Sequence, residues 1–213
     1  MRRGDHGAVA VEFALIVPIL FLMVLGIIEF ALALRDHTVV TSNVRMAVRV
    51  AATGAGAGAG SCHTGPEEPP CAPQNSPALA QEAADAIQRS GTEMPEDYIE
   101  YILIYQANSQ GYPGSEGNTT MPTSCASTPS CVRFTWRDSA NQFRYSGGTW
   151  DSSMINACFP GTPSAPQDRV GVYLRARHPF VTGLFGAGIT LSERAVMDFE
   201  PMPSDMCKAG EHE

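Results

Sequence analysis

The stretch HGAVAVEFALIVPILFLMVLGIIEFALAL, residues 6–34, decides the fold, because it is one long apolar run at the start of the chain. Residues 13–28 contain no charged side chain at all. At about 1.5 Å of rise per residue, a helix over 8–34 is long enough to cross a bilayer whose hydrocarbon core is about 30 Å thick. We therefore predict a membrane-spanning helix over 8–34, which Pro18 bends without ending.

Glu12 lies inside this run and needs an explanation, because an ionised carboxylate in a bilayer costs about 2.5–3.5 kcal/mol on insertion scales. A secretory signal peptide would explain the basic start and a cleavage site at Ala31-Leu32-Ala33. The apolar core is too long for that interpretation, and Glu29 would fall just before the cut. A plain membrane anchor explains the length but gives Glu12 no role.

A third interpretation gives Glu12 a role. If a peptidase cuts after Gly7, Ala8 becomes the new N-terminus and Glu12 the fifth residue of the mature chain. When such helices bundle, the Glu12 carboxylate of one subunit can meet the α-amino group of its neighbour. A buried pair then replaces two separate charges, and it sets the register between the helices.

A short basic leader, a Gly, four small or apolar residues and then Glu12-Phe13 resemble the class III signal peptides of type IV pilin-like proteins. Residues 7–34, followed by VRMAVRVAAT at 44–53, are similar to the N-terminal region of the TadE/TadF family. HPFVTGLFG (178–186) and ITLSERAVMDFEP (189–201) resemble the closing part of actinobacterial members. These proteins are pseudopilin-like components of the tight-adherence (Flp) pilus assembly system.

The resemblance implies a non-enzymatic, single-pass protein of the cell membrane that helps to assemble a tight-adherence pilus or a related secretion apparatus. It implies maturation by a prepilin-type peptidase that cuts after Gly7. The implied partners are other pilin or pseudopilin subunits and the assembly platform. The alternative is an unprocessed, membrane-anchored extracytoplasmic binding domain, and a third hypothesis is a secreted enzyme with an unrecognised site.

Glu29 stands seventeen residues after Glu12, near the far face of the membrane. One interpretation is that it reaches into the interfacial region beside Arg35. The other is that it contacts a partner helix.

Six cysteines lie after residue 52, and an even number beyond a membrane segment indicates disulfides in an oxidising compartment. Spacing favours Cys62–Cys71 and Cys125–Cys131 as local loops, which leaves Cys158–Cys207 by elimination. A zinc site is the alternative, but there is no CxxC motif and only His63 stands beside a cysteine. Arginines flank both ends of the span, so the cysteines decide the orientation: the N-terminus is cytoplasmic and the body extracytoplasmic.

The charge excludes nucleic acid as a partner. Residues 1–52 carry five arginines and four acidic residues, whereas the other 161 residues carry nine basic and eighteen acidic residues, which together give the net charge of −8. An acidic body without a basic stripe repels phosphate backbones.

Apolar periodicity divides the chain into five segments: a cytoplasmic leader (1–7), the span (8–34), a continuation of the helix (35–52), a Gly/Ala/Pro-rich linker (53–76) and an α+β domain (77–213). The domain should contain one short helix and a mainly antiparallel, disulfide-supported sheet of about five strands. The helix is expected at 77–91 and the strands at 98–105, 132–137, 142–145, 170–177 and 189–199. Glu193 interrupts the apolar row of the last strand, where we expect a bulge or a change of partner.

No catalytic, metal or cofactor motif is present. GAGAGAG (54–60) lacks the third glycine and the flanking strand of a dinucleotide-binding loop. The histidines at 37, 63, 178 and 212 are interpreted as solvated or structural. The uncharged stretch 180–188 carries Phe180, Leu184 and Phe185 among glycines. It is either a hairpin loop folded onto its own core or a contact with a partner subunit or the membrane surface.

Overall fold

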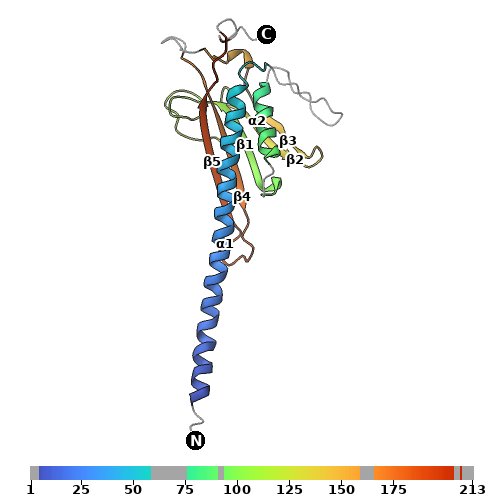
Figure 1. Cartoon of the computed structure of the whole chain (residues 1–213). Helices are drawn as coiled ribbons and strands as arrows, with labels where there is room; N and C mark the ends of the chain where they lie inside the picture. Colours follow the sequence, from blue (N-terminus) through green and yellow to red (C-terminus); the bar gives the residue numbers. More distant parts are fainter. Residues whose placement is uncertain (1–4, 59–75, 91–93, 159–165, 204–206, 208–213) are drawn as a thin grey trace.

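The computed structural model describes residues 5–58, 76–90, 94–158, 166–203 and 207. The first element is a single helix, α1 (Asp5–Thr53), which runs without interruption through Pro18. The predicted span and its predicted continuation are therefore one helix. Figure 1 shows that the N-terminal half of α1 projects alone like a stem, whereas the C-terminal half lies against the rest of the protein.

The body is an α+β unit, as the sequence predicts. Its sheet has the order β3-β2-β1-β4-β5, and every neighbouring pair is antiparallel. One short helix, α2, lies beside α1 on one face of the sheet (Figure 1). The elements are α2 (Ala78–Arg89), η1 (Glu96–Tyr98), β1 (Ile99–Gln106), β2 (Cys131–Arg137), β3 (Gln142–Thr149), η2 (Ser152–Met154), β4 (Arg169–His178) and β5 (Ile189–Asp198).

The main core lies between the two helices and the sheet. The apolar stripe predicted on the second half of α1 is fully buried there, at Val40, Val44, Ala47, Val48 and Ala51. The small side chains let the two helices approach closely. The next residues after α1 continue this approach, since a Cβ on Gly54 would lie 2.7 Å from the Cβ of Leu79 in α2. The C-terminal half of α1 is thus part of the core of the domain.

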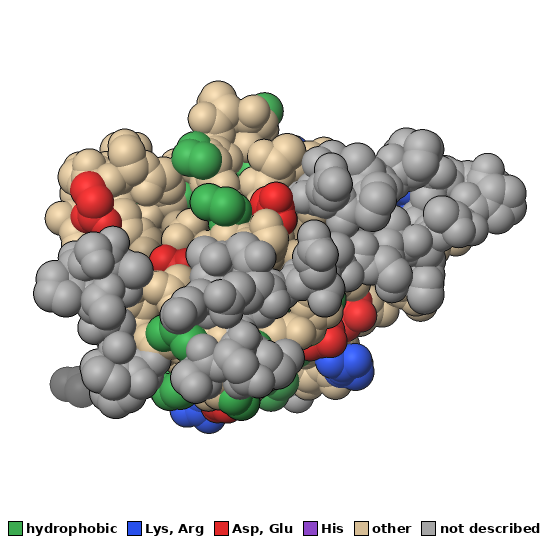
Figure 2. Space-filling model, turned by 90° about the horizontal axis from the view of Figure 1, so that it is seen from above, with side chains coloured by type: hydrophobic (Ala, Val, Ile, Leu, Met, Phe, Trp, Pro, Cys, Tyr) green, Lys and Arg blue, Asp and Glu red, His purple; other side chains and the backbone are tan. Residues whose placement is uncertain are grey.

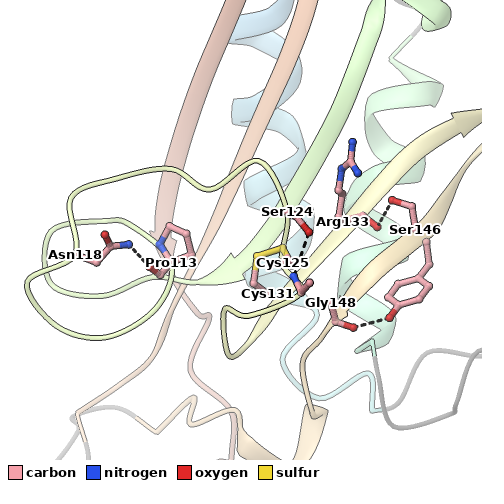
Figure 3. The surroundings of a disulfide bond; sticks show 10 residues. Pro113, Asn118, Ser124, Cys125, Cys131, Arg133, Ser146 and Gly148 are labelled. Carbon is pink, nitrogen blue, oxygen red and sulfur yellow. Dashed lines mark hydrogen bonds between the residues drawn. A yellow bond between two sulfur atoms is a disulfide. The ribbon is translucent and has the colours of Figure 1, made fainter.

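The opposite face of the sheet carries a smaller cluster around Leu103 and Tyr105, with the disulfide Cys125–Cys131 at its edge. Figure 3 shows this disulfide beside Gly148 at the end of β3. Gly148 has φ +95°, and a Cβ there would lie 2.2 Å from the carbonyl oxygen of Cys131. Only glycine fits this position, because both the backbone conformation and the space exclude a side chain.

Two of the cysteine pairs expected from spacing are disulfide bonds in the structure. The Cα atoms are 5.3 Å apart in Cys125–Cys131 and 4.6 Å apart in Cys158–Cys207. Both distances are normal for a disulfide. The third expected pair, Cys62–Cys71, lies outside the described residues.

The bulge expected at Glu193 is absent. The β4–β5 register is regular along its length, and Glu193 stands opposite Leu174. The irregularities lie instead between β1 and β4, at Ile99/Tyr101, and between β2 and β3, at Arg133/Phe134. Glu193 keeps a regular position in β5, on the face of the apolar side chains, because its Oε1 lies 3.4 Å from Nε2 of His37 on α1. The helix supplies a polar partner, so the strand does not need to turn the side chain away.

The shared core predicts how the protein can be truncated. A fragment of residues 35–213 should fold, whereas residues 77–213 should not unfold cooperatively, because they lose Val40, Val44 and Val48. Burial of three valines stabilises by about 5–9 kcal/mol, which is comparable to the whole stability of an ordinary domain. Circular dichroism during thermal unfolding distinguishes the two. Equal transition midpoints would show that α1 is dispensable for the core.

Candidate functional site

The N-terminal half of α1 exposes its apolar side chains. From Val9 onwards the helix is long and apolar enough to cross a membrane, and only 6% of its most apolar window is buried. Leu15 is 68% exposed and Phe30 is 71% exposed. Such a surface is unfavourable in water and suits a hydrocarbon environment. The helix therefore fits a single-pass membrane protein.

The two carboxylates in this apolar helix have opposite environments. Glu12 is exposed, and within the described part of the chain no hydrogen bond or ion pair is found for it. Phe13 beside it is 68% exposed. Glu29, in contrast, is only 1% exposed. One carboxylate is enclosed by its own chain, and the other faces outwards.

Glu29 is enclosed by residues 179–188, which connect β4 to β5 and are called the juxtamembrane loop below. Glu29 Oε2 accepts a hydrogen bond from the N–H of Val181 at 3.1 Å. Glu29 Oε1 accepts two from Thr182, from the N–H at 2.6 Å and from the hydroxyl at 2.7 Å. Three donors on one carboxylate are enough to hold it in a buried place.

These contacts of Glu29 are not predicted from the sequence. Within its own chain, Glu29 accepts hydrogen bonds from a loop more than 150 residues away, a contact that neither interpretation includes. The sequence contains only a weak signal for this contact: an uncharged loop with a lone hydroxyl, Thr182, at its turn.

Aromatic packing places the juxtamembrane loop against α1. The rings of Phe185 and Phe30 have centroids 6.3 Å apart, and Phe180 stands at the same distance from Phe185. A Cβ on Gly26 would lie 3.3 Å from the Phe185 ring, so the glycine makes room for it. Phe180 and Phe185 thus fold onto their own chain, yet Leu184 and Phe185 each remain 52% exposed. In Figure 1 this loop lies beside α1 below the end of the sheet.

A buried polar pair fixes the base of the juxtamembrane loop. Nδ1 of His178, the last residue of β4, lies 2.6 Å from Oδ2 of Asp36 on α1. His178 is only 5% exposed and also packs edge-on against Phe180. Gly188 closes the loop at φ +140°, where a Cβ would lie 2.3 Å from the carbonyl oxygen of His178. His178 is therefore structural, which is one of the two roles expected from the sequence.

A separate polar groove of about 690 Å³ lies where the 107–130 loop meets the start of β4. Burial raises the pKa of Asp168 there, and the N–H of Asn156, which donates to this carboxyl at 2.8 Å, opposes the shift. Ser109 donates its hydroxyl and its N–H to Glu116 and holds the pKa of that carboxyl below its usual range. Among the described residues, no group of three or more His, Cys, Asp or Glu could hold a metal ion.

The end of the protein opposite the stem has no concentrated feature on its described surface. Figure 2 looks down on this end and shows acidic side chains at several separate places, with hydrophobic side chains in small groups between them. Among the residues that the structure describes, most of the exposed large hydrophobic side chains lie on α1 and the juxtamembrane loop.

The proposed processing position lies in the first turns of α1, which begins at Asp5 and so includes Gly7 and Ala8. A comparison with known protein families also covers this region of the sequence. Residues 7–49 match the family model of the TadE-like protein, from Gly7 to Arg49. This match confirms the resemblance noted in the sequence and implies involvement in Tad pilus assembly. No curated protein and no solved structure matches the chain.

The contacts of Glu29 predict a change in loop dynamics. Glu29→Gln should make the amides of Val181 and Thr182 exchange roughly tenfold faster or more, because hydrogen bonds to a charged acceptor are replaced by weaker ones. Hydrogen–deuterium exchange of the full chain in nanodiscs measures this. Glu193→Gln, which changes a carboxylate outside the loop, is the control. Unchanged protection of both amides in Glu29→Gln would show that the carboxylate does not hold the loop.

Proposed function

We propose that this protein is a pseudopilin-like membrane protein that takes part in assembling a tight-adherence (Flp, type IV-like) pilus or a related secretion apparatus. The match of residues 7–49 to TadE-like proteins supports the family context. The observation that carries the proposal is the contrast between the two carboxylates. Glu29 is satisfied by its own chain, whereas Glu12 faces outwards from an apolar, membrane-suited surface.

A prepilin-type peptidase cuts after Gly7, where the absence of a side chain lets the backbone enter the active site. Ala8 then supplies a new α-amino group. In a bundle of helices this group meets Glu12 of a neighbouring subunit, which removes the cost of two separate charges in an apolar environment. Since Glu29 already has three donors, we assign the contact between helices to Glu12 and Phe13.

The N-terminus is cytoplasmic and the body extracytoplasmic. The disulfides Cys125–Cys131 and Cys158–Cys207 support this orientation, because such bonds persist in oxidising compartments. The partners are the peptidase, other pilin or pseudopilin subunits and the assembly platform. The role is non-enzymatic and needs no cofactor.

The alternative is an unprocessed, membrane-anchored extracytoplasmic domain that binds a ligand. The groove beside Asp168 and Glu116 favours this alternative, because it offers polar side chains in a concave place. The two hypotheses differ in whether the chain is cut.

Mass spectrometry of the protein from native membranes distinguishes them. We expect a mature chain that begins at Ala8. Gly7→Leu should leave the precursor uncut, whereas the control Gly4→Leu, which changes a glycine within the leader, should be processed normally. A mature chain that begins at Met1 or Arg2 would favour the unprocessed anchor, and one that begins at Leu34 would indicate a secreted protein.

The role of Glu12 is tested by co-purification of two differently tagged copies from membranes. Glu12→Gln should be cut normally but should co-purify several-fold less, because an amide cannot form the ion pair with the α-amino group. Glu29→Gln is the matched control, with the same change in the same helix, and should retain co-purification. If both variants associate like the parent protein, Glu12 does not pair subunits.

A further inference from the structure

We propose that the juxtamembrane loop inserts into the outer interfacial layer of the lipid bilayer, where Val181, Leu184 and Phe185 contact lipid. The body is then attached to the membrane at two points, α1 and the loop. This inference depends on the membrane insertion of α1 described above, but not on cleavage after Gly7 or on pilus assembly.

The position of the loop along α1 sets its depth. Residues 9–28 of the helix rise about 30 Å, which equals the thickness of the hydrocarbon core. Glu29, which the loop encloses, is the next residue. Phe185 reaches about one turn closer to the membrane, since it packs against Gly26. The tip of the loop therefore lies at the height where the hydrocarbon ends.

The chemistry of the loop fits this depth. Residues 179–189 contain no charged side chain. Val181 is 77% exposed, the highest value among the large hydrophobic side chains that the structure describes as exposed. Outside α1 there are six such side chains in the described residues, and four of them gather in or next to this loop: Val181, Leu184, Phe185 and Ile189. A cluster of this kind marks a contact with a partner or a membrane rather than with water.

Lipid fits this cluster better than a protein partner does, because the cluster continues the exposed apolar surface of α1. Phe185 packs at a tilt against Phe30, which is itself 71% exposed and lies just beyond residue 28 on α1. The rings of Phe30 and Phe185 therefore form one apolar surface that faces the same environment. An irregular loop cannot lie in the hydrocarbon core, where its backbone groups would lack partners, so the interfacial layer is the place that remains.

Polar groups hold the juxtamembrane loop at the level of the interfacial layer. Arg177 is exposed two residues before the loop begins, at the height of the lipid headgroups. The pair Asp36–His178 ties the end of β4 to α1, and Glu29 ties the tip. Because the loop is held at both places, its insertion fixes the tilt of the body relative to the membrane.

Tryptophan fluorescence with brominated lipid tests the proposal. The full chain is reconstituted in phosphatidylcholine vesicles in which part of the lipid carries bromine near the headgroup end of the acyl chains. Leu184→Trp should be quenched several-fold more than Met154→Trp. Met154 is a matched control, since it is 60% exposed but lies in η2, at the other end of the body. The parent protein gives the background from Trp136 and Trp150.

A third variant, Leu15→Trp, reports whether α1 is inserted. Quenching of Leu15→Trp without quenching of Leu184→Trp would overturn the loop proposal and leave membrane insertion intact. The same result would follow if a second protein subunit covered the loop, which also contradicts lipid contact. If Leu15→Trp is not quenched, the membrane-spanning role of α1 fails as well, and the proposed function fails with it.

Discussion

The enclosure of one carboxylate links the two halves of this protein. Glu29 stands near the end of the apolar part of α1, where a charge without partners would be unfavourable. The juxtamembrane loop supplies two backbone N–H groups and one hydroxyl to it. The same contact that satisfies the charge also brings the β4–β5 hairpin down along α1. Together with the buried stripe at Val40, Val44 and Val48, this contact places the body against α1.

A single helix connects environments of different chemistry. Its first part exposes apolar side chains and fits a membrane, and its last part buries Val40, Val44 and Val48 under the sheet. Between them, Glu29, Asp36 and His37 each meet a polar group of the β4–β5 hairpin. These contacts form a polar zone at the boundary between lipid and core. The helix is continuous through all three zones.

The match to the TadE-like family model covers residues 7–49, which all lie in α1. The part of the chain that the match leaves out contains the sheet, both described disulfides and the polar groove. Helix association and anchoring need only an apolar surface and a few polar residues, whereas selectivity for a partner needs a shaped surface.

The sequence by itself determined the elements. The long apolar run, the alternation in 132–137 and 170–177, and the spacing of Cys125 and Cys131 report local geometry, which depends on neighbours a few residues apart. The helix, the strands and these cysteine contacts were therefore predictable. Only the tertiary structure decided the partner of Glu29 and the regular strand at Glu193. Thr182 and His37 are each more than 150 residues from the carboxylate they meet, and no periodicity in the chain records which distant side chain packing will bring there.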